Sequence, residues 1–143
     1  MDAEDTLRKV PLFANLQPKQ LKSLAKWAVS RNYTPGQAIV SQGQHGLGLY
    51  CIQSGRVKIT QKTGGGEREI REMGPGESFG ELSLLSDMPR SATVTALEPT
   101  TCVLLDKPRF LAELRTYPDI ALEILPVVVN RLLESDKRIA ELS

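Results

Sequence analysis

The sequence predicts a mainly β protein with flanking helices: an antiparallel, jelly-roll-like β-roll with N-terminal helices before it and a long C-terminal helix after it. The middle of the chain carries short β-rich runs separated by glycine-containing turns, which is typical of an antiparallel sandwich or roll. Both ends carry apolar residues at helical spacing instead. The 143 residues suffice for one domain with a hydrophobic core. We divide this domain into segments 1–29, 30–106 and 107–143.

The first segment, residues 1–29, is predicted to be helical. Pro18 suits the first turn of a helix, because its fixed φ is helical and its missing N–H would be unpaired there anyway. Apolar residues then recur at helical spacing at Leu21, Leu24, Ala25 and Ala28.

The second segment, residues 30–106, is predicted to form the roll. Its β-rich runs are 38–40, 49–52, 57–60, 93–96 and 101–105. The glycines at 64–66 are interpreted as a hairpin tip and not as a phosphate loop, because no Lys-Ser/Thr pair follows them. Cys51 and Cys102 lie in apolar runs and are predicted to be small buried side chains, with a disulfide as the alternative.

The third segment is predicted to contain a short helix, 108–115, and a long helix from Pro118 to about Leu142. A spacing of four and three residues marks the seam of a two-stranded coiled coil, which predicts a homodimer. The seam residues are Ala121, Leu125, Val128, Leu132, Ser135, Ile139 and Leu142. The alternative is that these residues form core in a monomer. A second stripe, at 120, 124 and 127, is expected to pack on the roll, and Pro126 is expected to kink or restart the helix.

The composition excludes several classes of function. Lys and Arg total 18 against 17 Asp and Glu, so the formal charge of +1 argues against nucleic-acid binding by this domain alone. One His and two Cys exclude most metal chemistry, because a catalytic zinc needs about three protein ligands. No nucleophile–base pair is apparent, so we expect neither an enzyme nor a cofactor. The chain lacks a signal peptide and an apolar run of membrane length, so we expect a cytoplasmic protein without membrane contact.

The segment 76–94 carries the candidate site. A short helical patch at 81–85 interrupts the β-rich region, and backbone amides at its start are expected to form an anion site. Gly80 lets a ligand approach the backbone, since it has no Cβ. Arg90 is placed just before a strand, and its planar guanidinium can pair with two phosphate oxygens.

Glu81 would repel an anion at this site unless the ligand also presents a hydroxyl donor. An anion and a hydroxyl a few ångströms apart describe a ribose cyclic phosphate. The alternative is an ion pair between Glu81 and Arg90 that caps the helix, with no ligand involved. The residue types allow both interpretations.

The run Phe79-Gly80-Glu81-Leu82-Ser83-Leu84, followed by Arg90-Ser91-Ala92-Thr93-Val94, resembles the phosphate-binding cassette of the cyclic-nucleotide-binding domain family. In this chain the cassette spans 79–92. Further similarity to the family lies at 10–13, 33–36, 42–43, 50–55, 74–77 and 117–118. The resemblance therefore covers most of the chain.

The resemblance implies roles for individual residues. Arg90 is expected to pair with the cyclic phosphate and Glu81 to accept a hydrogen bond from the ribose 2′-OH. Backbone amides or small contacts around the sugar-phosphate are expected from Gly80, Leu82, Ser83, Ser91 and Ala92. The base is expected to lie between Ile59, Ile70 and Arg71. Ser135 falls where activator-type members contact the base from the long helix, although a lone seam Ser can also merely set the register.

The expected function is that of a receptor domain for cyclic AMP that converts ligand binding into movement of its C-terminal helix. Cyclic GMP is the alternative ligand, because the Ser91 hydroxyl is able to serve guanine. Two other interpretations stay open. One is a sensor fragment of an activator-like transcription regulator that lacks its DNA-binding domain, and the other is a structural or dimerisation module with an empty roll.

Overall fold

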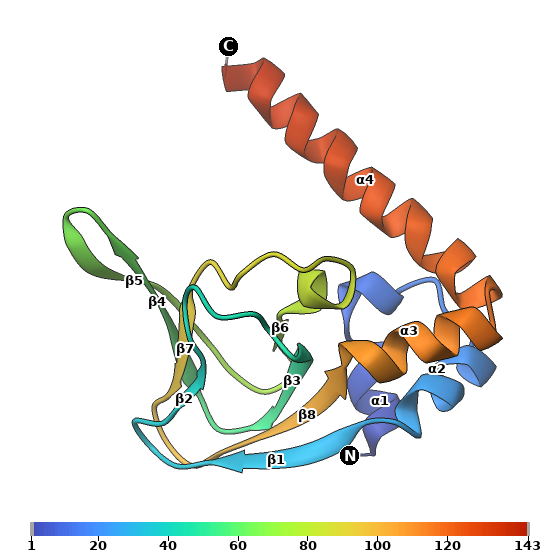
Figure 1. The fold of residues 1–143 in the computed structure, drawn as a ribbon, viewed down its shortest axis with the longest axis horizontal. Coiled ribbons are helices and arrows are strands. Elements are labelled where there is room, and N and C mark those ends of the chain that lie inside the picture. Colours follow the sequence, from blue (N-terminus) through green and yellow to red (C-terminus); the bar gives the residue numbers. More distant parts are fainter. Residues whose placement is uncertain (1, 143) are drawn as a thin grey trace.

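The computed structural model describes the backbone of residues 2–142 and the side chains of residues 2–138. Within this range the strands form two four-stranded sheets, with the orders β1-β8-β3-β6 and β2-β7-β4-β5 (Figure 1). All the strand pairings are antiparallel. The strands are β1 (Val29–Tyr33), β2 (Ala38–Val40), β3 (Gly48–Ser54), β4 (Val57–Thr63), β5 (Gly66–Met73), β6 (Ser78–Phe79), β7 (Thr93–Ala96) and β8 (Thr100–Asp106).

Helices gather at one end of the sheets and cover the face of β3 and β8 (Figure 1). The α-helices are α1 (Ala3–Arg8), α2 (Pro18–Ala25), α3 (Lys107–Thr116) and α4 (Asp119–Leu142), and the 3-10 helices are η1 (Pro11–Phe13) and η2 (Glu81–Leu84). The predicted fold class, antiparallel β with flanking helices and a long C-terminal helix, is confirmed.

Strand β3 is buried on both faces, because it separates two hydrophobic clusters. Leu49 and Cys51 face the helices, whereas Tyr50 and Ile52 face the second sheet. This division follows from the alternation of side chains along a strand. The run at 49–52 is therefore continuously apolar although the sheet is antiparallel.

The two cysteines lie on opposite faces of one sheet. Cys51 belongs to the helix-facing cluster and Cys102 to the cluster between the sheets, and both are free. Burial raises the pKa of each thiol to about 12. The prediction of small buried side chains is confirmed, and the alternative of a disulfide is wrong because the two side chains point apart.

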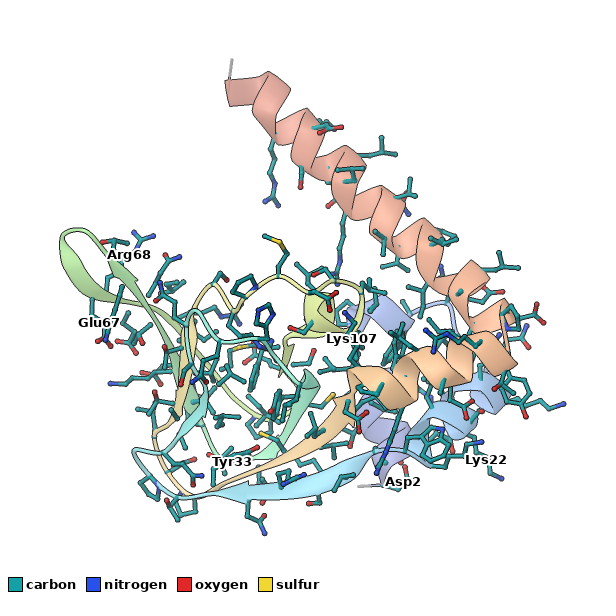
Figure 2. All side chains as sticks on the ribbon, in the orientation of Figure 1. Asp2, Lys22, Tyr33, Glu67, Arg68 and Lys107 are labelled. Carbon is teal, nitrogen blue, oxygen red and sulfur yellow. The ribbon has the colours of Figure 1, made fainter. Side chains whose placement is uncertain are left out.

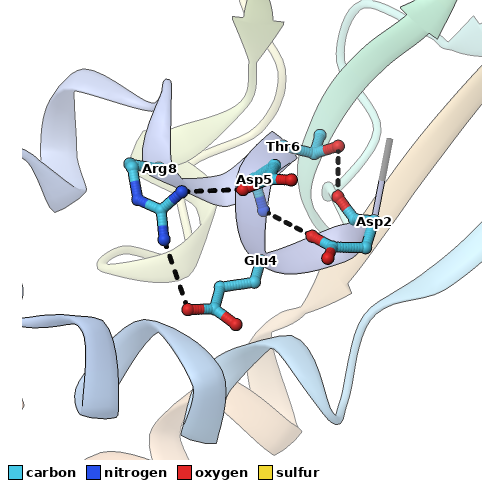
Figure 3. Close-up of polar contacts among 5 residues, drawn as sticks. All are labelled: Asp2, Glu4, Asp5, Thr6 and Arg8. Carbon is cyan, nitrogen blue, oxygen red and sulfur yellow. Dashed lines mark hydrogen bonds and ion pairs between the residues drawn. The ribbon is translucent and has the colours of Figure 1, made fainter.

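The first helix is fixed by local polar contacts. Asp5 N donates a hydrogen bond of 2.8 Å to Oδ1 of Asp2, which caps the N-terminus (Figure 3). At the other end of the helix, Arg8 forms ion pairs with the carboxylates of Glu4 and Asp5, at 3.2 and 2.7 Å. Helix α2 begins at Pro18 as predicted, and strand β1 begins at Val29, one residue before the expected start of the roll.

The β4–β5 hairpin projects from the second sheet, with Glu67 and Arg68 exposed near its tip (Figures 1 and 2). Thr63 pairs with Gly66, so the predicted glycine hairpin tip is confirmed. The register shifts by one residue between Ile59 and Thr60, and Ile70 is the extra residue on β5.

Helix α4 packs against η1 and α3 at its start and then extends away from the sheets (Figure 1). The predicted second stripe joins the helix-facing cluster: Ile120 and Ile124 are buried and Val127 packs against them. The helix runs through Pro126 without a break, so the restart did not occur. Within residues 2–142, no helix combines the length and apolar composition that a bilayer crossing needs.

The coiled-coil seam is only partly buried within this chain. Val128 packs against the helix-facing cluster, whereas Leu125 and Leu132 are 54% and 61% exposed. Ser135 is exposed as well. The side chains of Ile139 and Leu142 lie outside the described residues. The alternative that the whole seam is core of a monomer is therefore wrong for Leu125 and Leu132.

Candidate functional site

The cassette, residues 79–92, connects β6 to β7. Gly80 has φ +83°, a left-handed conformation that favours glycine, and it directly precedes η2. The predicted helical patch is thus a 3-10 helix, in which Ser83 N donates to Gly80 O at 2.9 Å. The chain then returns to β7 through Pro89 and Arg90.

This connection lines a half-open pocket of about 410 Å³. The volume is within the range of small-molecule sites. The pocket is lined by Gly80, Glu81, Leu82, Ser83, Ser86, Met88, Pro89, Arg90 and Ser91. Six of the residues predicted for the site are therefore brought together: Gly80, Glu81, Leu82, Ser83, Arg90 and Ser91.

Arg90 lies between the pocket and the backbone of β3. Its Nη2 donates a hydrogen bond of 2.7 Å to the carbonyl oxygen of Gly48, and its guanidinium lies 5.8 Å from the ring centroid of Tyr50. Burial lowers the pKa of Arg90, although Tyr50 and Glu81 partly oppose this effect. The guanidinium nevertheless stays charged at neutral pH, because its ordinary pKa is far above 7.

The Nε atom of Arg90 is buried and has no hydrogen-bond partner among the described residues. A buried N–H without an acceptor is unfavourable by about 1–3 kcal/mol. This Nε lies against Gly46, which does not line the pocket, whereas other atoms of Arg90 do line it. An anion that reaches the guanidinium is a chemically suitable partner for its charge and its N–H groups.

Glu81 forms its ion pair with helix α4 and not with Arg90. Its Oε1 lies 3.2 Å from Nη1 of Arg131, fifty residues later in the chain. The alternative interpretation of a Glu81–Arg90 ion pair is therefore wrong for this structure. The ion pair to Arg131 links the cassette directly to the C-terminal helix.

The remaining predicted residues do not line the pocket. Ile59 packs in the cluster between the sheets, whereas Ile70 is 48% exposed at the bulge of β5. Nη2 of Arg71 lies 2.5 Å from Oε1 of Glu77, outside the pocket. Ala92 is partly buried beside the pocket lining, and Ser135 is exposed on α4. The ligand contacts expected of these five residues stay predictions.

Two polar contacts hold the cassette against neighbouring elements. Lys107 is the first residue of α3 (Figure 2). Its Nζ pairs with Asp87 and lowers the pKa of that carboxyl. On the other side, His45 is exposed, but its backbone forms an isolated β-bridge with Pro89. The cassette is thus anchored at both sides of the pocket.

Sequence reasoning missed Arg131, Tyr50 and the loop that contains Gly46. Arg131 lies one helical turn before Ser135, so the two share a face of α4. That spacing was an available signal for Arg131. The Gly46 loop offered no comparable signal, because its place beside Arg90 depends on the folding of distant segments.

Comparison with known proteins agrees with this geometry. Residues 30–117 match the family described as "Cyclic nucleotide-binding domain". The chain is 37% identical over 134 residues to a cyclic AMP receptor protein of Thermus thermophilus, covering 93% of this chain and 62% of that protein. It is 39% identical over 111 residues to a cAMP-dependent protein kinase regulatory subunit of Dictyostelium discoideum, covering 75% of this chain and 34% of that protein. The chain thus spans less than two thirds of the length of either relative.

A solved structure is similar over nearly its whole length. The N-terminal domain of a transcriptional regulator from Streptomyces coelicolor superposes with a TM-score of 0.85 at 32% identity, covering 93% of this chain and 96% of that one. The family match, residues 30–117, includes the cassette and every strand of both sheets except Val29 at the start of β1. The chain belongs to the cyclic nucleotide-binding domain family.

Proposed function

We propose that this chain is a receptor domain for cyclic AMP that transmits ligand binding through its C-terminal helix. The observation that carries this proposal is that Arg90, whose buried Nε has no acceptor among the described residues, and Glu81 line the same pocket of about 410 Å³. A cation and a hydrogen-bond acceptor placed together suit a ligand that presents both an anionic phosphate and a hydroxyl.

Each group has a defined task in this proposal. Arg90 pairs with the cyclic phosphate, and Glu81 accepts the hydrogen bond of the ribose 2′-OH. Ser83 and Ser91 line the same pocket and contact the sugar-phosphate. The domain performs no catalysis, and the ligand is released unchanged.

The ion pair between Glu81 and Arg131 supports the proposed coupling to α4. A ligand hydroxyl that engages Glu81 competes with Arg131 for the same carboxylate. Binding therefore changes the free energy of at least one contact that holds α4 beside the cassette. A ligand shifts such an equilibrium only by its different affinity for the two arrangements, typically about 1–3 kcal/mol.

Cyclic AMP is the proposed ligand because one relative is named a cyclic AMP receptor protein and another a regulatory subunit of a cAMP-dependent kinase. A third relative, 41% identical over 101 residues, is named a cGMP-dependent protein kinase, so the relatives support both nucleotides. Ser91 keeps cyclic GMP as the alternative, because its hydroxyl lies at the pocket and is able to bond to guanine. Ser135 is the residue of α4 proposed to reach the base.

Isothermal titration with cyclic AMP, cyclic GMP, cyclic di-GMP and 2′-deoxy cyclic AMP tests the proposal. We expect the native chain to bind cyclic AMP and to bind the 2′-deoxy analogue more weakly. The variant Glu81→Ala should bind the two ligands equally, because it lacks the carboxylate proposed to accept the 2′-OH. Hydrogen exchange should show changed protection of α4 near Arg131 on adding cyclic AMP, with α2 unchanged. Absence of heat and of thermal stabilisation with the whole panel would favour a structural module with an empty roll.

A second candidate is the sensor part of a transcription regulator. The similarity to the N-terminal domain of a Streptomyces regulator, which covers 96% of that domain, favours this context. A native reading frame that continues into a helix-turn-helix segment would establish it. In either context we propose a cytoplasmic protein and a homodimer formed through α4.

A further inference from the structure

Gly46 lies in the loop before β3, where a side chain would collide with Arg90. A Cβ built on Gly46 would lie 2.5 Å from Cζ and 2.6 Å from Nη2 of Arg90. Both distances are shorter than carbon and nitrogen atoms tolerate without a bond. The guanidinium therefore occupies the space that any other residue at position 46 would fill.

Gly48 and Gly80 form the other walls of the same slot. The carbonyl oxygen of Gly48 accepts the hydrogen bond of Arg90 Nη2 at 2.7 Å. A Cβ on Gly80 would lie 2.8 Å from that Nη2 and 2.7 Å from the Gly48 oxygen. The guanidinium of Arg90 therefore fills the space that a side chain at Gly80 would take, a role that the sequence did not predict for this glycine.

The backbone of the Gly46 loop cannot easily move away from Arg90. Gly43 N donates to Arg90 O at 2.8 Å, and Arg90 N donates to Gln44 O at 2.8 Å. The bridge between His45 and Pro89 extends this pairing. A clash at position 46 must therefore be relieved by the Arg90 side chain.

We propose that Gly46 is a positioning residue for Arg90: the missing side chain at 46 sets where the guanidinium lies and so directs it toward the ligand. The inference rests on the proposed function, in which Arg90 binds the cyclic phosphate. Gly46 is also the most informative of the three glycines to replace. Gly48 and Gly80 have φ values of +159° and +83°, so their replacement would also strain the backbone, whereas Gly46 is outside the positive range.

The variant Gly46→Ala is expected to fold, because the displaced atoms are the far end of a flexible side chain. It is expected to lose the hydrogen bond to Gly48 O and at least about tenfold in affinity for cyclic AMP, by isothermal titration. Such a loss corresponds to about 1.4 kcal/mol. Gly74→Ala is the matched control, since a Cβ there would displace Nη1 of Arg56 at 2.8 Å, and Arg56 pairs with Glu72 away from the pocket.

A thermal-unfolding cycle without ligand separates this inference from the proposed function. Gly46→Ala should lower the melting temperature when Arg90 is present. In the Arg90→Leu background it should leave the melting temperature unchanged, because leucine lacks the guanidinium atoms that a side chain at position 46 would meet. Equal effects in both backgrounds would overturn the positioning role, as would unchanged cyclic AMP affinity of Gly46→Ala. Failure of the native chain to bind any cyclic nucleotide would overturn the proposed function, while the melting cycle still decides the role of Gly46.

Discussion

Arg90 is the residue on which the candidate site depends. Its guanidinium is held by the Gly48 carbonyl and the Tyr50 ring, and its Nε faces no acceptor among the described residues. The side chain is therefore fixed before any ligand arrives. Fixed charged donors bind an anion better than mobile ones, because less side-chain entropy is lost on binding.

Replacement of Arg90 by leucine is expected to weaken cyclic AMP binding at least about tenfold. The removed charge-assisted contact is worth about 1.5–3 kcal/mol, and each 1.4 kcal/mol corresponds to one decade in affinity. Isothermal titration measures the change, with Arg56→Leu as the control because Arg56 forms an exposed ion pair with Glu72. Unchanged affinity of Arg90→Leu would contradict the assignment of the phosphate site.

At the scale of elements, the carboxylate of Glu113 joins α3 to the end of α2. It is 4% exposed and accepts hydrogen bonds of 2.6 Å from both Ser23 Oγ and Trp27 Nε1, and it pairs with Lys26 at 3.0 Å. Burial by itself raises the pKa of Glu113, but these donors outweigh it, so the pKa lies below its ordinary value of 4.5. Helix α3 in turn supports the start of α4.

This lowered pKa predicts how stability depends on pH. A depressed pKa in the folded state stabilises the fold above the unfolded pKa, near 4.5, and the stabilisation is lost as the pH falls through the folded pKa. Glu113→Gln should reduce the free energy of unfolding at pH 7 by about 1–3 kcal/mol, since it disrupts a buried set of hydrogen bonds. Urea unfolding at pH 7 and below pH 4.5 measures both effects.

The difference between the native chain and Glu113→Gln should shrink as the medium becomes acidic. Glu98→Gln is the control, because Glu98 is exposed. Its replacement should alter neither the free energy of unfolding at pH 7 nor the dependence of that free energy on pH. The free energies of unfolding of the native chain and of Glu113→Gln are compared from pH 7 to strongly acidic conditions. A difference that stays constant over this range would show that the charge of Glu113 has no part in stability.

On the scale of the whole molecule, α4 presents an apolar surface that the described residues leave exposed. Leu122, Leu125, Leu132 and Leu133 are each more than half exposed. Leu125 and Leu132 belong to the predicted coiled-coil seam, and Leu122 and Leu133 lie next to it in sequence. Burial of such apolar side chains against a second helix is favourable, because it removes them from water. The proposed homodimer through α4 would bury these leucine side chains.

Leu132→Glu is expected to convert a dimer into a monomer without unfolding the chain. The side chain is 61% exposed in the single chain, so a carboxylate there meets water, whereas in a helix pair it would be desolvated. Light scattering after size-exclusion chromatography measures the mass, with Leu97→Glu as the control, because it makes the same substitution at an exposed leucine outside α4. A monomeric native chain at micromolar concentration would contradict the proposed dimer.

Much of the site could be read from the sequence because it is local. Gly80, Glu81 and Arg90 lie in one connection between two strands, so their placement at one pocket follows from a single segment. The expected contacts of Ile59, Ile70 and Arg71 depend on other elements, and none of the three lines the pocket. A one-residue bulge at Ile70 and the ion pair of Arg71 with Glu77 lie at these positions, and periodicity alone does not reveal them.

The sequence by itself determined the β architecture, the helical ends and the cassette, because periodicity, turn residues and a short motif act over a few neighbouring positions. Only the tertiary structure decided that Glu81 pairs with Arg131, that Cys51 and Cys102 face opposite ways, and that Gly46 makes room for Arg90. These contacts join segments tens of residues apart. They arise when the sheets and helices pack together, and packing depends on the shape of the whole domain.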